Sequence, residues 1–114
     1  MSQRIQRVNQ LIKREISQIL LKDVEFPSGT LVTVTRVETS SDLKNSNIFI
    51  STLPEKEISR VLDFLNREIY ELQQKINKLL KMRPVPRLKF IGEKETAEAG
   101  RIEEILEKLK KQEK

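Results

Sequence analysis

The chain contains no cysteine and no histidine among its 114 residues. Without cysteine it can form neither a disulfide framework nor a thiolate metal site. Without histidine it lacks the commonest general base and the commonest ligand of transition metals. A nucleophile–base pair would have to combine a hydroxyl group with a lysine or a carboxylate. We therefore predict that the protein is not an enzyme and uses no metal or other cofactor.

Other residue types are scarce, and each scarcity argues against a class of site. The three aspartates, Asp23, Asp42 and Asp63, are far apart in sequence, which disfavours a nuclease centre of converging carboxylates. The three glycines form no phosphate-binding loop. Aromatic residues are 4% of the chain and mostly fall on predicted strands or apolar stripes. We predict that most of them lie in the core and that no aromatic platform stacks on bases.

Long hydrophobic runs are also missing. No apolar segment approaches the roughly 20 residues that a membrane-spanning helix needs, and residues 2–4 are polar, unlike the start of a signal peptide. The length suits one compact domain. We expect a cytoplasmic protein with one domain at residues 1–110 and a frayed basic tail at 111–114.

Charge is unevenly distributed along the sequence. There are 22 lysines and arginines against 17 acidic residues, so the net charge is +5. Residues 1–14 hold four cations and residues 72–92 hold six, with no acid in either window. The two windows together carry +10, which leaves −5 for the rest of the chain. Such segregation is typical of a surface that faces a polyanion, and chance clustering on a mixed-charge surface is the alternative.

The first half of the chain predicts a helix and two strands. Residues 2–22 form an amphipathic pattern, because apolar residues recur at three- and four-residue spacings from Ile5 to Leu20. Residues 31–38 and 47–53 are rich in β-branched residues and predict strands. The polar residues between these strands suit a hairpin with a wide loop.

Residues 55–81 keep one helical phase of apolar residues throughout. A straight helix of that length would span about 40 Å, too long for a globular domain whose radius of gyration is about 13 Å. We therefore predict a bend between Arg67 and Glu71, or two successive helices. A coiled coil is the alternative, and the predicted strands on either side argue against it.

The last third of the chain predicts a strand and a final helix. Arg83-Pro84-Val85-Pro86 ends the helical segment, because each proline restricts the preceding residue to extended conformations. Residues 87–91 then predict a strand with apolar residues on one face and basic residues on the other. Apolar spacing between positions 102 and 109 predicts a helix. The order indicates an α+β domain with helices on one face of a small three-stranded sheet.

The cations of the two acid-free windows are the candidate binding residues. Each cation that neutralises a phosphate releases counterions, so binding would depend on salt without depending on base sequence. Lysines near the end of the helical segment could instead complement the helix dipole. Recognition of folded RNA by its shape and backbone fits the composition best. The predicted RNA-binding residues are Arg4, Arg7, Lys13, Arg14, Lys75, Lys78, Lys81, Arg83, Arg87 and Lys89.

The sequence resembles the ribosome-binding factor A family along nearly the whole chain. The most specific stretches are Val37-Glu38-Thr39-Ser40-Ser41-Asp42-Leu43 and Pro86-Arg87-Leu88-Lys89-Phe90. Arg4-Ile5-Gln6-Arg7-Val8 and Gly100-Arg101-Ile102 match as well. One departure is clear: the Ala-x-Gly kink usual in the family would fall at Glu68-Ile69-Tyr70, where this chain has neither small residue.

The resemblance implies a single type II KH-like domain that lacks the Gly-x-x-Gly loop of KH domains. It implies binding to immature small ribosomal subunits through ribosomal RNA, help with maturation of the RNA 5′ end, and importance in cold adaptation. Assembly GTPases are candidate further partners. Two alternatives stay open: a generic KH-like RNA-binding module, and a helical protein whose basic face meets an acidic protein. We expect a monomer, because no apolar stripe is left to form a coiled-coil seam.

Overall fold

The computed structural model describes residues 3–26 and 29–93. In chain order these residues form α1 (Gln3–Lys22), β1 (Leu31–Thr39), β2 (Asn45–Leu53), the 3-10 turn η1 (Glu55–Glu57), α2 (Ile58–Arg67), α3 (Ile69–Leu79) and β3 (Arg87–Gly92). The predicted helix at 102–109 and the predicted tail at 111–114 lie outside the described residues. The other predicted helices and strands are confirmed.

The sheet has the order β1-β2-β3, with β2 antiparallel to β1 and parallel to β3. Residues 40–44 separate β1 from β2, so the predicted hairpin, with a loop longer than a tight two-residue turn, is confirmed, although both strands extend further into the polar connection than predicted. At this end of the pair, the hydroxyl groups of Thr39 and Ser46 hydrogen-bond across the strands at 2.8 Å. Ser46 is fully buried, so this bond satisfies a polar group that would otherwise weaken the end of the ladder.

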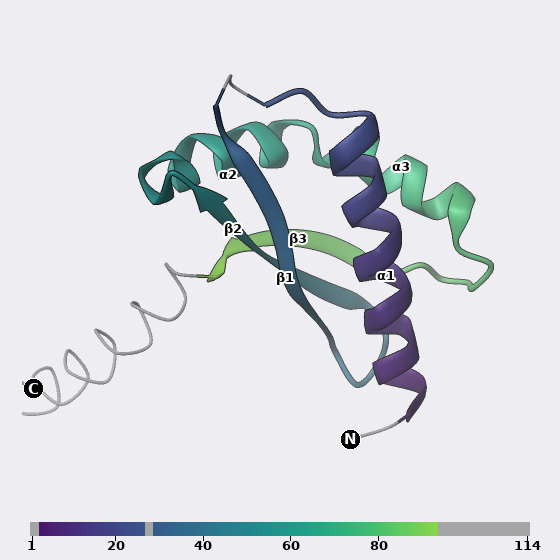
Figure 1. Cartoon of the computed structure of the whole chain (residues 1–114). Helices are drawn as coiled ribbons and strands as arrows, with labels where there is room; N and C mark the ends of the chain where they lie inside the picture. The colour runs from purple at the N-terminus through teal and green to yellow at the C-terminus, as the bar shows by residue number, and fades with distance from the viewer. Residues whose placement is uncertain (1–2, 27–28, 94–114) are drawn as a thin grey trace, which may run out of the picture.

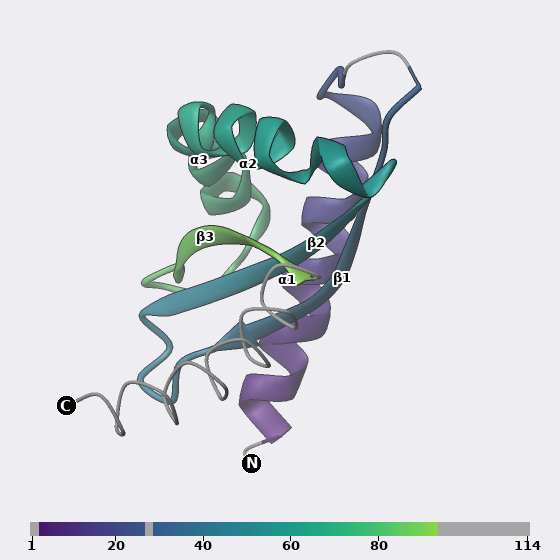
Figure 2. The ribbon, with the colours of Figure 1, turned by 90° about the vertical axis from the view of Figure 1, so that its left-hand side faces the viewer.

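The three helices pack on one face of the sheet, as the sequence predicts (Figures 1 and 2). In Figure 1, α1 and α3 lie side by side to the right of the strands, and α2 crosses above them. Ile48 and Ile50 of β2 and Leu88 and Phe90 of β3 belong to the same core cluster as the buried stripes of the helices. The basic residues of β3 therefore point to the opposite face, which we call the outer face.

The helical segment that follows η1 breaks at Glu68, where φ is −94° and ψ is 9°. The predicted bend is therefore confirmed, although neither small residue of the family's kink is present. The apolar phase continues across the break, so Leu65 of α2 and Ile76 of α3 are both fully buried against the same core. The segment forms two helices on a sheet and not a coiled coil.

A bulge in β1 decides which side chains of this strand reach the core. The pairing with β2 shifts between Val34 and Arg36, so Thr35 is the extra residue. As a result Val34 and Val37 are both buried in the core, although strict alternation would put them on opposite faces. Arg36 turns to the outer face instead.

Candidate nucleic-acid interface

The hairpin tip, residues 39–45, is built by the first of the two specific motifs. The Ser40 hydroxyl donates to Asp42 Oδ1 at 2.6 Å, and the Lys44 backbone N–H donates to the same oxygen at 3.0 Å. The Ser40 hydroxyl also accepts from the Asn45 N–H at 3.0 Å. The Ser40 hydroxyl and then the Lys44 N–H hold the pKa of Asp42 below its ordinary value. The motif therefore fixes a compact turn that ends in an exposed lysine.

The second specific motif meets the hairpin tip in space. The Arg87 N–H donates to the Lys44 carbonyl oxygen at 2.8 Å, and Asn45 pairs with Arg87 in the parallel ladder. Lys44 thus lies beside the start of β3, although it belongs to neither acid-free window. We call Lys44, Arg83 and Arg87 the basic corner. Lys44 was not among the predicted binding residues, because only the parallel pairing of β2 with β3 brings it to the corner.

Gln73 of α3 ties the helix to the start of β3. Its Oε1 accepts from the Leu88 backbone N–H at 2.9 Å. Its Nε2 donates to the Pro86 carbonyl oxygen at 3.0 Å and to Asn77 Oδ1 at 3.1 Å. Both hydrogen-bonding groups of the Gln73 amide are therefore used. A side chain of the preceding helix, α3, therefore holds the Pro-x-Pro segment in place.

An open hollow of about 420 Å³ lies where α3 gives way to β3. It is lined by Gln73, Asn77, Arg83, Pro84, Val85 and Arg87. Arg83 Nη1 donates to the carbonyl oxygens of Leu80 at 3.0 Å and Met82 at 2.7 Å, which fixes this guanidinium against the end of the helix. The structure therefore brings the predicted residues Arg83 and Arg87 together on one site.

The other predicted residues of the second window are placed around this corner. Lys78 is exposed in the last turn of α3, and Lys81 is exposed just beyond it. Lys89 is exposed on the outer face, two residues along β3 from Arg87. Lys75 differs, because its Nζ forms an ion pair at 3.4 Å with Asp23 Oδ2 at the end of α1. That contact joins α3 to the end of α1 and partly neutralises the charge of Lys75.

The predicted residues of the first window do not form one cluster on α1. All four are exposed. Arg7 and Arg14 are seven residues apart and share one side of the helix, whereas Lys13 lies about 100° further round from Arg14. Arg14 also pairs with Glu15, with 3.2 Å between Nη2 and Oε1. The helix therefore presents a basic flank through Arg7 and Arg14 and a separate cation at Lys13.

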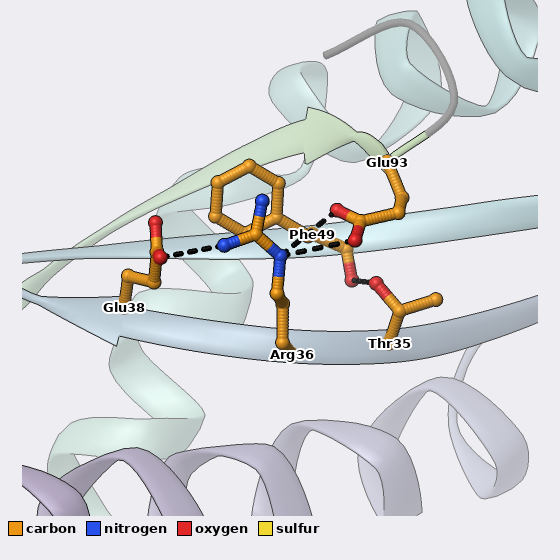
Figure 3. A network of polar contacts seen from close by, with 5 residues as sticks. All are labelled: Thr35, Arg36, Glu38, Phe49 and Glu93. Atoms are coloured by element: carbon orange, nitrogen blue, oxygen red, sulfur yellow. Dashed lines mark hydrogen bonds and ion pairs between the residues drawn. The ribbon is translucent and has the colours of Figure 1, made fainter. Parts of the chain in front are cut away.

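On the outer face, Arg36 covers Phe49 (Figure 3). The guanidinium carbon lies 3.8 Å from the ring centroid, and Phe49 is only 4% exposed. Arg36 Nε donates to both carboxylate oxygens of Glu93, at 3.0 and 3.1 Å, and Nη1 donates to Glu38. The hydrogen bond to Glu93 is the main reason why the pKa of Arg36 is raised. Because Arg36 covers the ring, Phe49 offers no free face to a base.

The remaining aromatic residues mostly fit the prediction that they belong to the core. Phe90 is buried, and Phe26 and Phe64 pack edge to face with their ring centroids 5.9 Å apart. Tyr70 is the exception, because 69% of it is exposed in the first turn of α3. It lies two residues after the break at Glu68 and points to solvent.

The described residues form neither a metal-binding cluster nor a membrane-spanning helix. Within residues 3–26 and 29–93, no group of three or more His, Cys, Asp or Glu side chains is placed to hold a metal ion. Over the same residues, no helix combines the length and apolar character needed to cross a membrane.

Comparison with known proteins gives consistent matches. The family model described as ribosome-binding factor A matches residues 4–106. The ribosome-binding factor A of Bdellovibrio bacteriovorus is 36% identical over 107 residues, which cover 93% of this chain and 80% of that protein.

A crystal structure and a fitted homology model of ribosome-binding factor A from Thermus thermophilus are also similar. The crystal structure superposes with a TM-score of 0.67 at 23% identity, over 77% of this chain and 94% of that chain. The coordinates fitted into a cryo-EM map of a 30S complex give a TM-score of 0.64 at 26% identity, over 73% and 88% of the two chains. These relatives have a KH-like fold, so the predicted fold is confirmed. The family match, the identity over most of the chain and the shared fold agree that the chain belongs to the ribosome-binding factor A family.

Proposed function

We propose that this protein is an assembly factor that binds ribosomal RNA in immature small ribosomal subunits. The observation that carries the proposal is the family match over residues 4–106. A Thermus relative, 26% identical to this chain, has been fitted into a map of a 30S complex. The chain's own contribution is a basic corner of Lys44, Arg83 and Arg87 at the edge of the sheet.

Binding would stabilise one conformation of the RNA without a chemical step by the protein. Cations on the surface neutralise phosphates and position the domain, while the rigid sheet and helices select RNA of matching shape. We propose that the held conformation favours maturation of the RNA 5′ end by other enzymes. At low temperature, incorrectly paired helices of the RNA open more slowly. The factor would therefore matter most in cold adaptation.

The proposed footprint centres on the basic corner and extends to the cations around it. Arg83 and Arg87 line one hollow, and Lys78, Lys81 and Lys89 are exposed near it. Lys75 would contribute less, because Asp23 already pairs with it. The cations of α1, which are Arg4, Arg7, Lys13 and Arg14, form a second part of the proposed footprint.

The test is co-sedimentation of the protein with purified immature and mature small subunits at several salt concentrations. We expect binding to immature subunits, with an affinity that falls as salt rises. Replacing Arg83 and Arg87 by alanine should weaken binding and reduce the slope of log K against log salt by about one unit for each lost phosphate contact. The matched control replaces Lys56 and Arg60, two exposed cations of η1 and α2, and should bind as the unchanged protein does.

The same experiment separates the alternatives. Equal binding to mature and immature subunits would favour a generic RNA-binding module. Weak binding to ribosomal RNA fragments even at low salt would favour an acidic protein partner. If the control variant loses affinity as much as the Arg83 and Arg87 variant, the footprint is misplaced.

We further propose that the protein acts in the cytoplasm as a monomer and that assembly GTPases promote its release. Sedimentation equilibrium at micromolar concentration should give the mass of one 13.4 kDa chain. A stable dimer would contradict the monomer. Release can be measured by adding purified assembly GTPases and GTP to the loaded subunits and following the bound factor.

A further inference from the structure

We propose that the hollow between α3 and β3 is a preorganised site for one backbone phosphate of RNA, in which Gln73 positions Asn77 as a hydrogen-bond donor. This inference rests on the proposed function for the identity of its ligand and deepens it by assigning one contact. Asn77 and Gln73 are uncharged and lie outside the set of cations that the sequence suggests.

The orientation of both amides follows from the backbone groups that they contact. The Leu88 backbone N–H can only donate, so the Gln73 atom at 2.9 Å from it is the oxygen. The other Gln73 atom is therefore the nitrogen, which agrees with its contact to the Pro86 carbonyl oxygen. That nitrogen donates to Asn77, so the Asn77 atom at 3.1 Å is an oxygen. Asn77 Nδ2, with no protein partner among the described residues, is left as a donor.

The charge around Asn77 is positive. Arg83 and Arg87 line the same hollow, and none of its described lining residues is acidic. Arg83 uses only Nη1 to bind the carbonyl oxygens of Leu80 and Met82. Its Nε and Nη2 groups remain available as a fixed fork of donors, the arrangement that suits two oxygens of a phosphate. Because main-chain contacts already hold the guanidinium, binding loses little side-chain entropy.

A phosphodiester of a longer RNA fits this location better than a free phosphate. The hollow is open at the edge of the sheet and does not enclose its contents. The Lys44 carbonyl is bonded to the Arg87 N–H, and Lys89 is exposed two residues further along β3. A strand of RNA that continued from the hollow along β3 would bring its neighbouring phosphates to these exposed lysines. A single phosphate would leave both without an anionic partner.

The first test compares two substitutions that change net charge equally. Asn77→Asp keeps an oxygen for Gln73 but replaces the donor by a carboxylate in a hollow that Arg83 and Arg87 also line. Asn66→Asp makes the same change on an exposed residue of α2, outside the proposed footprint. We expect Asn77→Asp to weaken binding to immature small subunits by about 10- to 100-fold, the range for losing a hydrogen bond to a charged group. Asn66→Asp should weaken it less than about threefold, through net charge alone.

A second test examines the hollow without the ribosome. The free protein, labelled with nitrogen-15, is titrated with a 5′-hydroxyl RNA oligonucleotide, which has only internal phosphodiesters, and separately with adenosine monophosphate and inorganic phosphate. We expect the side-chain N–H signals of Asn77, Arg83 and Arg87 to shift saturably with the oligonucleotide at low salt. If the monophosphates shift them and the oligonucleotide does not, the site takes a terminal phosphate and the proposal is wrong.

The positioning role of Gln73 needs a control for stability. Gln73→Met should abolish the response of the Asn77 side-chain amide, at a temperature where circular dichroism shows a folded protein. Leu65→Ala, a core change expected to destabilise the fold by a similar amount, should keep that response. If both variants lose it, Gln73 acts only through stability.

Should Asn77→Asp fail to fold, Asn77→Ala replaces it in the comparison of subunit binding, because alanine removes the donor without adding charge.

These outcomes separate the hollow from the wider proposal. If the unchanged protein binds immature subunits and Asn77→Asp binds no worse than Asn66→Asp, the hollow is not a phosphate site and the assembly function stands. If the unchanged protein does not bind subunits but its hollow still responds to the oligonucleotide, the assembly function fails and the phosphate site stands.

Discussion

Replacing Gln73 by methionine should destabilise the protein far more than an exposed helix position normally would. Methionine has a similar volume and helix propensity, so the change removes hydrogen bonds with little effect on packing or helix formation. Two of the three lost bonds are to main-chain groups of Pro86 and Leu88. Pro86 is fully buried and Leu88 is 4% exposed, so water cannot easily replace the amide.

The size of the effect follows from those two groups. An unsatisfied buried donor or acceptor costs about 1–3 kcal/mol, and Asn77 can turn to solvent at little cost. We expect a loss of about 3 kcal/mol in the free energy of unfolding. At an m-value of roughly 1.5 kcal/mol/M, the midpoint of urea unfolding should fall by about 2 M.

Gln74→Met is the matched control, because Gln74 is the exposed neighbour on the same helix. Its free energy of unfolding should change by no more than about 0.5 kcal/mol. Urea unfolding followed by circular dichroism gives both values. If the two variants lie within about 0.5 kcal/mol of each other, the bonds from Gln73 are replaced by water and the reasoning about this corner is wrong.

Three further predictions concern the rest of the domain. Ser40→Ala should raise the pKa of Asp42 toward its ordinary value, which a carbon-13 NMR titration of the carboxyl measures; an unchanged pKa would mean that the hydroxyl bond is absent in solution. Because folding lowers this pKa, Asp42 stabilises the folded state above the unfolded pKa of about 3.9, and this contribution is lost as pH falls through the lower folded value. Arg36→Lys should cost about 1 kcal/mol in urea unfolding, since lysine loses the paired bonds to Glu93 and the planar stack, and no cost would refute that role. Leu65→Ala should cost about 2–5 kcal/mol in the same assay, and a smaller loss would mean that the core closes around the cavity.

Much of the fold could be predicted because local patterns and chain length agree with it. The apolar stripes of α1 and α3 face the core as their spacing indicates, and the bend at Glu68 follows from the length of the helical segment. The alternation of apolar and basic residues in β3 correctly predicts which side chains are buried and which are exposed. Each of these features depends on residues that are close in sequence.

The features that could not be predicted depend on contacts between distant residues. The bulge at Thr35 changes the faces of β1, so a strict period of two would have placed Arg36 on the core side with Val34. The role of Gln73 was hidden, because a glutamine on a charged helix usually faces solvent and its main-chain partners lie beyond the proline segment. The nearness of Lys44 to Arg87 depends on the parallel pairing of β2 with β3, which no local pattern specifies.

That parallel pairing also bears on the order in which the molecule forms. The β1–β2 hairpin joins neighbouring segments, so its closure loses little chain entropy and it can form early. α2 and α3 separate β3 from β2 in the chain, so the pairing of these two strands requires closing a much longer loop. The hollow and the basic corner are therefore expected to be completed last, together with the native sheet. A chain that had collapsed without placing β3 would lack this surface, so only fully folded molecules would engage RNA there.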